Sequence, residues 1–457
     1  MIGSGPGGCA AALTAARRGL RTAVVERGAW GGVCLNVGCI PTKALISVAR
    51  FWRRIGQAEH LGIRVAGAKL DWPAVMARNS RIVSGLRDGL TELLRRENVE
   101  RIEGTALFKD AHTVQVTNGS TSRALKPQRV VIATGSRPVS GPWQLDEKRI
   151  VSYRGLLAMA ERPRSLLVIG GGVIGCEFAS LFSAFGTDVT LVEQQQSVLP
   201  AEDPEAVSWL LRRLEASKVR VLTGTTIRSL TSSDNHVDAV FSDETEARFD
   251  AALVAVGYQP AIDSLGLDAA GIAADRGIRV DAFLRTSQPH IAAIGDCLQG
   301  RGLAHWAAAE GRLAVENLLG ASQQALDATQ VPRCIYTDPE IASVGRATIP
   351  AEGIRISRLF MAAIGKNVCD DETDGIVKLA VEEGTDRVVG ASIVGEQASA
   401  LIHVVVLAMH HGLTAKQLAH TLTAHPSLAE AVTETAAHVY GESLVAAARP
   451  ARPSAGR

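Results

Sequence analysis

Two cysteines five positions apart are the residues best suited to redox chemistry in this sequence of 457 residues. They lie in the segment Gly31-Gly-Val-Cys34-Leu-Asn-Val-Gly-Cys39-Ile-Pro-Thr-Lys43, whose residues are compatible with a helix. On one distorted helical turn the two sulfur atoms come close enough to form a disulfide, and a thiolate there is a nucleophile. Two alternatives stay open: a pair of buried structural thiols, and half of a metal site. A zinc site needs further Cys or His ligands, and no second pair at that spacing occurs.

A histidine and a glutamate near the C-terminal end form a second candidate for chemistry. The segment His425-Pro-Ser-Leu-Ala-Glu430 places a carboxylate five positions after an imidazole. Pro426 suits the first position of a helix, so we expect Glu430 about one turn further on, within reach of the imidazole. A histidine oriented in this way is a general acid or base. Without such a context, any one of the 11 histidines is more simply a core or surface residue.

Two glycine-rich motifs predict phosphate binding. They are Gly3-Ser-Gly5-Pro-Gly-Gly8 and Gly170-Gly-Gly172-Val-Ile-Gly175, and an acid follows the first glycine of each by 23 residues, Glu26 and Glu193 respectively. Such glycines allow a tight turn, a close approach of the backbone to a pyrophosphate, and close packing of helix on strand. The acid accepts hydrogen bonds from ribose hydroxyls. One motif alone is weak evidence, but two copies with equal spacing predict two dinucleotide sites.

The residues around Glu193 predict which nicotinamide nucleotide is bound. A carboxylate at this position accepts the 2′-hydroxyl of NAD and repels the 2′-phosphate of NADP. The following residues, 194–198, are Gln-Gln-Gln-Ser-Val and include no Arg or Lys that would hold the extra phosphate. NAD is therefore favoured over NADP.

The elements that must position these residues repeat along the chain. Leu166–Ile169 is expected to be the strand that enters the second glycine motif, but only Met1 and Ile2 stand at the corresponding place in the first. The first strand is therefore expected to be shortened. Either the natural start lies upstream, where a targeting segment would be out of sight, or the first dinucleotide site is impaired.

The chain is expected to be an α/β protein with two Rossmann-like dinucleotide-binding domains and a C-terminal α+β domain. In the C-terminal part we expect strands at Gly375–Val381 and Arg387–Val394 and a helix over Ser399–His411. The predicted limits are 1–145 with 257–330 for the first dinucleotide domain, 146–256 for the second, 331–445 for the C-terminal domain, and 446–457 for a disordered tail.

Composition excludes several classes of protein. The 48 basic and 47 acidic residues nearly cancel, and aromatic residues make up only 4%, so we expect no nucleic-acid partner. We expect no membrane span either, since the longest apolar runs found, Ser165–Gly175 and Leu401–Met409, fall short of about 18 residues. Seven cysteines with one close pair favour a reducing, cytoplasmic compartment over a secreted disulfide framework.

The cysteine segment resembles the redox-disulfide signature of the class I pyridine nucleotide–disulfide oxidoreductases. The resemblance runs from Gly3 to about His438 and includes both glycine motifs. It also includes the segments Ala133-Thr-Gly135, Ile294-Gly-Asp296 and Tyr336-Thr-Asp-Pro-Glu-Ile-Ala-Ser-Val-Gly345. It implies FAD on the first unit, a nicotinamide nucleotide on the second, and a C-terminal domain through which two copies form a homodimer.

The resemblance also implies roles for single residues. Lys43 and Glu177 would pair beside the flavin, Asp296 would bind the ribityl chain, and Ala106 would face the adenine. The residues implied for FAD are Gly3, Gly5, Gly8, Glu26, Lys43, Ala106, Thr134, Gly135, Ser136, Asp296, Gly302, Leu303, Ala304 and His305. Those implied for NAD are Gly170, Gly172, Gly175, Glu177, Glu193 and Gly257. No metal ligand is implied.

Within this family, three segments are similar to the dihydrolipoamide dehydrogenases. They are Leu303-Ala-His305 with Glu310-Gly311, Asp371–Gly375 followed by Gly390–Gly395, and the His425–Glu430 box. The similarity implies oxidation of dihydrolipoamide to lipoamide with reduction of NAD⁺, through FAD and a Cys34–Cys39 disulfide. It implies a His425 acid/base contributed by the other subunit and oriented by Glu430. The implied partner is a lipoyl-bearing protein of a 2-oxo acid dehydrogenase-type or glycine-cleavage complex.

Two departures from the family pattern keep alternatives open. Val33 stands where Thr is usual, and Gly257-Tyr258-Gln-Pro260-Ala261 replaces the usual GRxPN. The alternatives are another disulfide reductase, of glutathione-like or mercuric type, and a truncated flavoprotein subunit without catalysis. The C-terminal tail has no cysteine pair of the kind that mercuric or thioredoxin substrates require, and Glu193 opposes the NADP that glutathione-type enzymes favour.

Overall fold

The computed structural model describes residues 1–300, 302–321, 323–346 and 351–447, and in it the chain forms two compact units. The first unit comprises Met1–Gly170, Ser229–Val240 and Glu246–Leu326. The second comprises Gly171–Arg228, Phe241–Thr245 and the chain from Asp327 onward. Of the tail predicted to be disordered, residues 448–457 lie outside the described residues.

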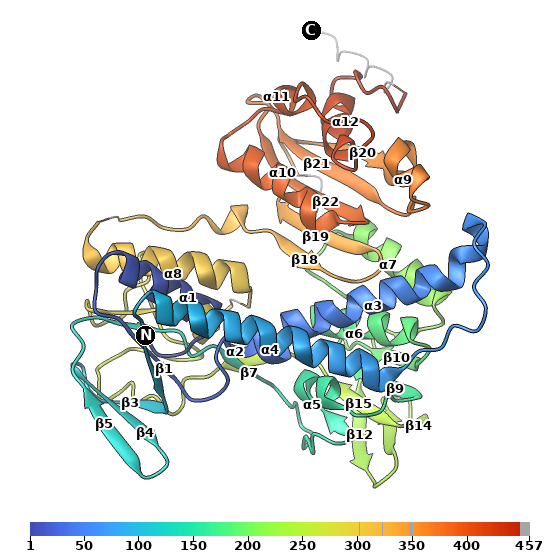
Figure 1. Ribbon diagram of the computed structural model, residues 1–457. Helices are drawn as coiled ribbons and strands as arrows, with labels where there is room; N and C mark the ends of the chain where they lie inside the picture. Colours follow the sequence, from blue (N-terminus) through green and yellow to red (C-terminus); the bar gives the residue numbers. More distant parts are fainter. Residues whose placement is uncertain (301, 322, 347–350, 448–457) are drawn as a thin grey trace. The chain divides into compact units, whose positions relative to one another are not determined.

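The first unit is built around a small parallel sheet covered by helices (Figure 1). Along the sheet the order is β2 (Glu100–Glu103), β1 (Ala23–Glu26), Ile2, β6 (Val130–Ile132) and β17 (Ile291–Ala293), because Ile2 bridges β1 and β6 in parallel. Its helices are α1 (Pro6–Arg17), α2 (Gly32–Val37), α3 (Cys39–Gln57), η1 (Ala58–Leu61), α4 (Trp72–Arg96), α5 (Tyr153–Ala158), η2 (Gly295–Cys297) and α8 (Ala304–Leu319). Its strands, wholly or mostly within the unit, are β1 (Ala23–Glu26), β2 (Glu100–Glu103), β3 (Thr105–Asp110), β4 (Thr113–Asn118), β5 (Thr121–Leu125), β6 (Val130–Ile132), β7 (Ser136–Pro138), β8 (Ile150–Val151), β9 (Ser165–Ile169), β12 (Ile227–Ser232), β13 (Val237–Phe241), β14 (Glu246–Phe249), β15 (Ala251–Val254), β16 (Tyr258–Pro260) and β17 (Ile291–Ala293).

The short segment ahead of Gly3 takes the place of a central strand. The Ile2 amide donates to the Val131 carbonyl at 2.9 Å, and the Ala133 amide donates to the Ile2 carbonyl at 2.8 Å. On the other side the Gly3 amide donates to the Val25 carbonyl at 2.8 Å. The sheet therefore runs without a gap through a segment that forms only a single-residue bridge.

Two glycines let the helices of this unit approach closely. Helices α1 and α8 lie side by side, and a β-carbon on Gly311 would fall 2.3 Å from the Gly7 carbonyl oxygen.

Away from the helices, β3, β4 and β5 form an antiparallel meander, and β7 pairs antiparallel with β16. Farther along the chain, β15 pairs in parallel with both β8 and β9.

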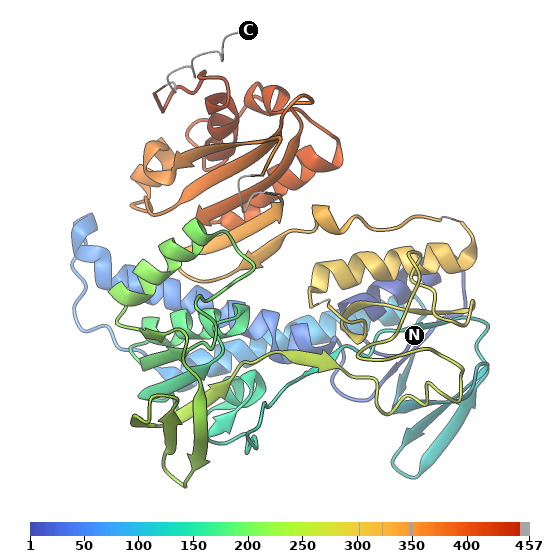
Figure 2. The same ribbon diagram turned by 180° about the vertical axis from the view of Figure 1, so that it is seen from behind.

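The second unit contains an antiparallel five-stranded sheet. Its strand order is β18 (Arg333–Ile335), β19 (Glu340–Gly345), β22 (Val388–Gly395), β21 (Ile376–Glu382) and β20 (Ile354–Phe360). Helix α10 packs on β19 and β22, and α12 packs on β20 and β21. Figure 2 shows this sheet from behind. The helices of the unit are α6 (Val173–Ala184), α7 (Pro204–Ala216), η3 (Ala328–Gln330), η4 (Met361–Ala363), α9 (Gly365–Cys369), α10 (Ala398–His410), α11 (Ala415–Ala419) and α12 (Glu430–His438). Its strands are β10 (Asp188–Val192), β11 (Arg220–Leu222), β18 (Arg333–Ile335), β19 (Glu340–Gly345), β20 (Ile354–Phe360), β21 (Ile376–Glu382) and β22 (Val388–Gly395).

The C-terminal elements confirm the periodicity of the sequence to within one residue. Strands β21 and β22 and helix α10 lie where they were expected, and their apolar residues share one buried core. The alternation of apolar side chains on a sheet and their helical spacing on α10 therefore serve the same interior.

One expectation about apolar runs was wrong. The stretch Gly32–Leu61 is long and apolar enough to cross a membrane, judged by length and composition alone. It is interrupted at Gly38, where α2 ends and α3 begins. The buried residues of α3 (Pro41, Thr42, Leu45, Ile46 and Ala49) lie along one face of the helix. Packing of this helix face accounts for part of the apolar character of the stretch, of whose most apolar window 28% is buried.

Candidate active site

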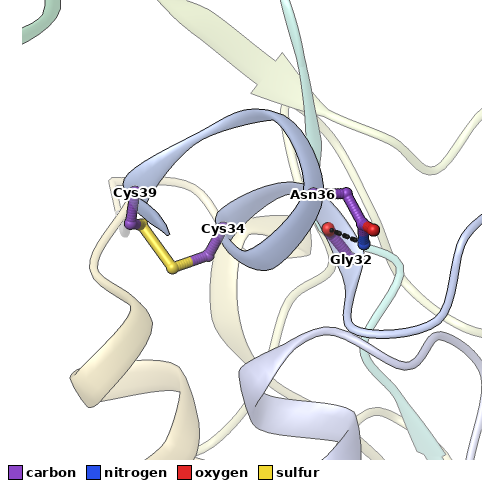
Figure 3. Close-up of a disulfide and its surroundings, with 4 residues drawn as sticks. All are labelled: Gly32, Cys34, Asn36 and Cys39. Atoms are coloured by element: carbon purple, nitrogen blue, oxygen red, sulfur yellow. Dashed lines mark hydrogen bonds between the residues drawn. A yellow bond between two sulfur atoms is a disulfide. The ribbon is translucent and has the colours of Figure 1, made fainter. Parts of the chain in front are cut away.

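The predicted disulfide between Cys34 and Cys39 is present (Figure 3). Cys34 lies within α2 and Cys39 is the first residue of α3, with 4.6 Å between their α-carbons. Gly38 separates the two helices with a non-helical backbone (φ −132°, ψ −109°). A β-carbon there would lie 3.1 Å from the Val33 carbonyl oxygen, so the close turn favours glycine. This break is the distorted turn that brings the two sulfur atoms together.

Asn36 holds the turn that carries Cys34, and sequence reasoning did not single it out. Its side-chain amide donates to the carbonyl oxygens of Trp30 and Gly32, both at 2.9 Å. The bond to Gly32 is drawn in Figure 3. Arg87 of α4 donates to the Asn36 side-chain oxygen at 3.3 Å. The Cys34 side of the disulfide thus lies on a short helix that is fixed by side-chain hydrogen bonds as well as by its own backbone.

The first glycine motif has two crowded positions and one open position. A β-carbon on Gly3 would lie 2.3 Å from the Ala133 carbonyl oxygen, and one on Gly8 would lie 2.0 Å from the Gly3 carbonyl oxygen. A β-carbon on Gly5 would meet nothing within 4 Å. Gly5 is also the N-cap of α1 and has no side-chain capping bond. The open side at a helix N-terminus fits a phosphate group.

Glu26 lies at the end of β1 and faces the same loop. One of its carboxylate oxygens accepts from the Ser4 amide at 2.8 Å, and the other accepts from the Gly28 amide at 2.8 Å. Charged groups that accept from backbone amides are strongly held. The carboxylate is therefore fixed beside the loop, where the sequence pattern predicts a ribose.

The second glycine motif repeats this arrangement. Glu193 is buried, and its carboxylate accepts from the Gly171 amide at 2.6 Å and from the Gln195 amide at 2.8 Å. These three positions follow Glu26, Ser4 and Gly28 by 167 residues. The equality of the two hydrogen-bond sets supports the repeat that the sequence pattern indicates.

The glycines of the second motif also divide into crowded and open positions. A β-carbon on Gly170 would lie 2.4 Å from the Ala255 carbonyl oxygen, whereas one on Gly172 would meet nothing within 4 Å. Gly175 is buried in α6. The open glycine again precedes a helix, which fits a second phosphate-bearing cofactor.

A group of polar atoms near the end of β6 fits the rest of a flavin nucleotide. Ser136 donates to the Asp296 carboxylate at 3.0 Å. Burial raises the pKa of Asp296, although this hydrogen bond lowers it and so offsets part of the effect. The Thr134 hydroxyl is buried and has no hydrogen-bond partner among the described residues. Gly135 and Gly302 have positive φ angles of 71° and 124°. A polar ligand at this place would satisfy the Thr134 hydroxyl.

The other residues predicted for FAD and NAD lie in both units. Ala106 is buried in β3, Lys43 lies on α3, and Gly257 has a φ of 123°. Leu303, Ala304 and His305 form the start of α8. Glu177 of α6 is buried and accepts from the Tyr336 amide at 2.9 Å. Since Lys43 and Glu177 belong to different units, their ion pair stays a prediction.

His425 and Glu430 are joined as expected, but not by the helix that was expected. The His425 Nδ1 atom and the Glu430 Oε1 atom are 2.8 Å apart, and the other carboxylate oxygen accepts from the Ser427 amide at 2.7 Å. The expectation that Pro426 begins the helix was wrong, because α12 begins at Glu430. The residues between form a turn that brings the imidazole back to the first residue of the helix. The His425 side chain is 78% exposed, so its second ring nitrogen is accessible to a partner.

Within the described residues, no group of three or more His, Cys, Asp or Glu side chains is arranged to hold a metal ion.

Comparison with known proteins finds related sequences along nearly the whole chain. A family model for pyridine nucleotide-disulphide oxidoreductases matches residues 1–311, and one for the dimerisation domain of the same family matches residues 331–436. The chain is 38% identical over 453 residues to a dihydrolipoyl dehydrogenase of Geobacillus stearothermophilus, covering 97% of this chain and 96% of that protein. It is 39% identical over 448 residues to one of Chlorobaculum tepidum, covering 95% of each chain.

Solved structures with the same fold cover a similar share of the chain. LpdA from Mycobacterium tuberculosis is 29% identical, with a TM-score of 0.91 over 96% of this chain and 98% of that one. The HOCl-induced flavoprotein disulfide reductase RclA from Escherichia coli is 29% identical, with a TM-score of 0.86 over 96% of this chain and 99% of that one. The predicted fold class, with its C-terminal dimerisation domain, is confirmed.

Proposed function

Because the chain belongs to the pyridine nucleotide-disulphide oxidoreductase family, we propose which of its residues oxidise dihydrolipoamide and reduce NAD⁺. The chain is an FAD- and NAD-dependent oxidoreductase of the dihydrolipoyl dehydrogenase type, with a redox-active Cys34–Cys39 disulfide, and it forms a homodimer. The observation that carries the proposal is this disulfide, held at the break between two helices of the first unit.

The disulfide takes up the two electrons of the substrate by thiol exchange. His425 of the partner subunit removes a proton from one substrate thiol, which at a free pKa of about 8.5 is mostly protonated at neutral pH. The substrate thiolate attacks the Cys34 sulfur, the Cys34–Cys39 bond breaks, and Cys39 leaves as a thiolate. The second substrate thiol attacks the substrate sulfur of the mixed disulfide, its proton passes to the departing Cys34 sulfur, and the cyclic disulfide product is released. The substrate is oxidised by two electrons, Cys34 is left as a thiol and Cys39 as a thiolate, and the first proton stays on His425.

Glu430 keeps the imidazole in position for this proton transfer. Its contact with His425 Nδ1 leaves the other ring nitrogen for the substrate, as a general base requires. The carboxylate is itself held by the Ser427 amide, so the orientation is fixed from two sides. The imidazolium formed when the proton is taken is then stabilised by the neighbouring negative charge.

The nucleotides fit the two repeated loops. The first loop, with Gly3, Gly5, Gly8 and Glu26, would hold FAD together with Lys43, Ala106, Asp296 and the segments 134–136 and 302–305. The second loop, with Gly170, Gly172, Gly175 and Glu193, would hold NAD together with Glu177 and Gly257. When bound, FAD and NAD supply the two-electron chemistry that returns the dithiol to the disulfide. The protein supplies positions and charges: Glu193 selects NAD over NADP, and Asp296 stays beside Ser136.

We infer the remaining assignments from the same premise. The physiological substrate is a lipoyl-bearing protein of a 2-oxo acid dehydrogenase-type or glycine-cleavage complex, met in the cytoplasm. The FAD domain comprises residues 1–145 and 257–330, the NAD domain 146–256 and the interface domain 331–445. Parallel pairing of β17 with β6 supports the return of the chain to the FAD domain.

Two assays and one variant test the proposal. The purified protein should reduce NAD⁺ with dihydrolipoamide and should oxidise NADPH with glutathione disulfide little or not at all. Cys34→Ser should lower the dihydrolipoamide rate by about a thousandfold or more while the flavin absorption remains, since the nucleophile is lost but the cofactor site is not. Full dihydrolipoamide activity in Cys34→Ser, or a faster reaction with glutathione disulfide, would contradict the proposal.

A further inference from the structure

The Ser4 side chain connects the first nucleotide loop to the segment that carries the cysteines. Ser4 is fully buried. Its hydroxyl donates to a carboxylate oxygen of Glu26 at 2.7 Å and accepts from the Gly31 amide at 3.0 Å. Its own amide donates to the same Glu26 oxygen at 2.8 Å. One hydroxyl thus forms hydrogen bonds both to Glu26, the acid predicted to bind ribose, and to Gly31, the first residue of the cysteine segment.

The second copy of the motif lacks this connection. Gly171 stands at the position of Ser4, and there the Leu199 amide donates directly to the Gly171 carbonyl at 2.9 Å. A β-carbon on Gly171 would lie 2.7 Å from a methyl carbon of Val198 and 2.9 Å from the Glu193 β-carbon. The second loop therefore has no room for a serine. The hydroxyl occurs only in the copy whose acid is followed by redox cysteines.

Gly31 is the point at which the hydroxyl acts on the cysteine segment. It is the N-cap of α2, and its φ of 97° is a conformation that favours glycine. The next residue, Gly32, lies so near the loop that a β-carbon there would come within 2.7 Å of the Gly5 α-carbon. Asn36 then ties Gly32 to the turn that carries Cys34. Without the hydroxyl the buried Gly31 amide loses its partner, which makes this start of the helix the weak point.

We propose that Ser4 is a positioning residue, whose side chain fixes the position of the Glu26 carboxylate relative to the start of α2, the helix that contains Cys34. A nucleotide bound at Glu26 is thereby held at a fixed position relative to the disulfide, although no part of the Ser4 side chain is accessible to substrate. The proposal rests on the proposed function in one respect: the nucleotide at Glu26 is FAD.

Hydrogen exchange in the full-length protein as purified tests the connection without relying on activity. In Ser4→Ala we expect the peptide spanning residues 29–36 to exchange about tenfold faster, because the Gly31 amide opens locally. Ser4→Gly, which carries the residue of the second copy, should do the same and guards against misfolding of the alanine variant. Thr14→Ala is the matched control, because among the described residues the Thr14 hydroxyl donates to the Ala10 carbonyl of its own helix and not to the cysteine segment. That variant should leave residues 29–36 unchanged.

Kinetics at saturating FAD distinguish positioning from a general structural effect. In Ser4→Ala we expect kcat with dihydrolipoamide to fall about tenfold, since small displacements of reacting groups lower rates. The KM for NAD⁺ should not change, because NAD is held by the second loop. Unchanged exchange over residues 29–36, or faster exchange spread evenly over the first unit, would overturn the role of Ser4. Failure of the wild-type protein to bind FAD would instead overturn the proposed function, and the difference in exchange between Ser4→Ala and Thr14→Ala would stand.

Discussion

Burial separates the redox-active cysteines from three of the other thiols of the chain. Cys9, Cys176 and Cys297 are buried without disulfide partners. Desolvation raises the pKa of Cys9 and of Cys297 to about 12, and it raises that of Cys176 as well. A thiol reacts as its thiolate, so these three stay unreactive near neutral pH. The burial of these three cysteines therefore reflects packing rather than redox chemistry.

Alkylation of the reduced protein checks this distinction. At pH 8 we expect iodoacetamide to label Cys34 and the exposed Cys369, while Cys9 and Cys297 react about a thousandfold more slowly than a free cysteine. Peptide mass spectrometry at several times gives the rates. The same protein unfolded in urea should label at every cysteine. Fast labelling of Cys9 in the native protein would contradict the assigned burial.

The contact between Glu430 and His425 leads to a prediction about pH. Hydrogen bonds from His425 and from the Ser427 amide lower the pKa of Glu430, so its carboxylate is ionised at and above its usual titration range. Its orienting effect is therefore present from neutral pH down past that range, and it is lost only as the pH falls through the lowered value. The acid limb of the activity profile should then belong to another group.

Glu430→Gln should lower kcat/KM for dihydrolipoamide about ten- to hundredfold at pH 8, because the imidazole loses its charged partner. Glu434→Gln on the same helix is the control, since that carboxylate accepts from Ser443 and Leu444 instead. A wild-type profile recorded from pH 5 to 9 completes the test. Equal activities of the two variants would remove Glu430 from the orienting role.

At the residue scale, the sequence predicts the residues that react better than it predicts the residues that hold them in position. Cys34, Cys39, His425 and Glu430 are recognisable because their types and spacing serve a reaction. Asn36 and Ser4 are not, since a polar residue acquires its role only when the fold brings carbonyls and amides to it. Alignment of the two glycine motifs would have indicated Ser4, because the serine stands there against a glycine.

At the scale of elements, each glycine loop, together with its strand and helix, makes the same set of contacts in both copies of the repeat. Glu26 and Glu193 each accept from two backbone amides at equivalent positions. The sequence repeat predicts this because the same local path needs the same glycines and the same acid. The break at Gly38 is compatible with the low helix propensity of glycine, but its backbone angles are less predictable. The close approach of the Val33 carbonyl oxygen, seen only in the structure, accounts for a turn at this residue.

The duplicated loops predict that the two nucleotide sites respond separately to mutation. Glu26→Gln should weaken FAD binding about ten- to hundredfold, because hydrogen bonds to a charged group contribute about 1.5–3 kcal/mol. Glu193→Gln should raise the KM for NAD⁺ by a similar factor and leave the FAD content unchanged. Flavin fluorescence during titration of FAD-free protein and steady-state kinetics give the two values. If either variant affected both nucleotides equally, the separation would be wrong.

At the scale of the whole molecule, we expect the site to take residues from two chains. Cys34 lies in the first unit and His425 in the second. The dimerisation domain brings two copies together, and a two-fold dimer contains two equivalent sites. The sequence of one chain specifies the local geometry of each residue, but not which copy supplies the histidine. We carry that assignment over from the family resemblance.

Mixed dimers of two inactive variants decide which chain supplies the histidine. Cys34→Ser and His425→Gln homodimers should each be nearly inactive. If the site takes Cys34 from one chain and His425 from its partner, each mixed dimer holds one intact site and one site with both substitutions. Random exchange of subunits makes about half of the dimers mixed, so activity should recover to about a quarter of the wild-type value. If both residues came from the same chain, every site in a mixed dimer would carry one substitution and no activity would return. Tagged subunits, purified through both tags, show that the mixed dimer formed and make a negative result decisive.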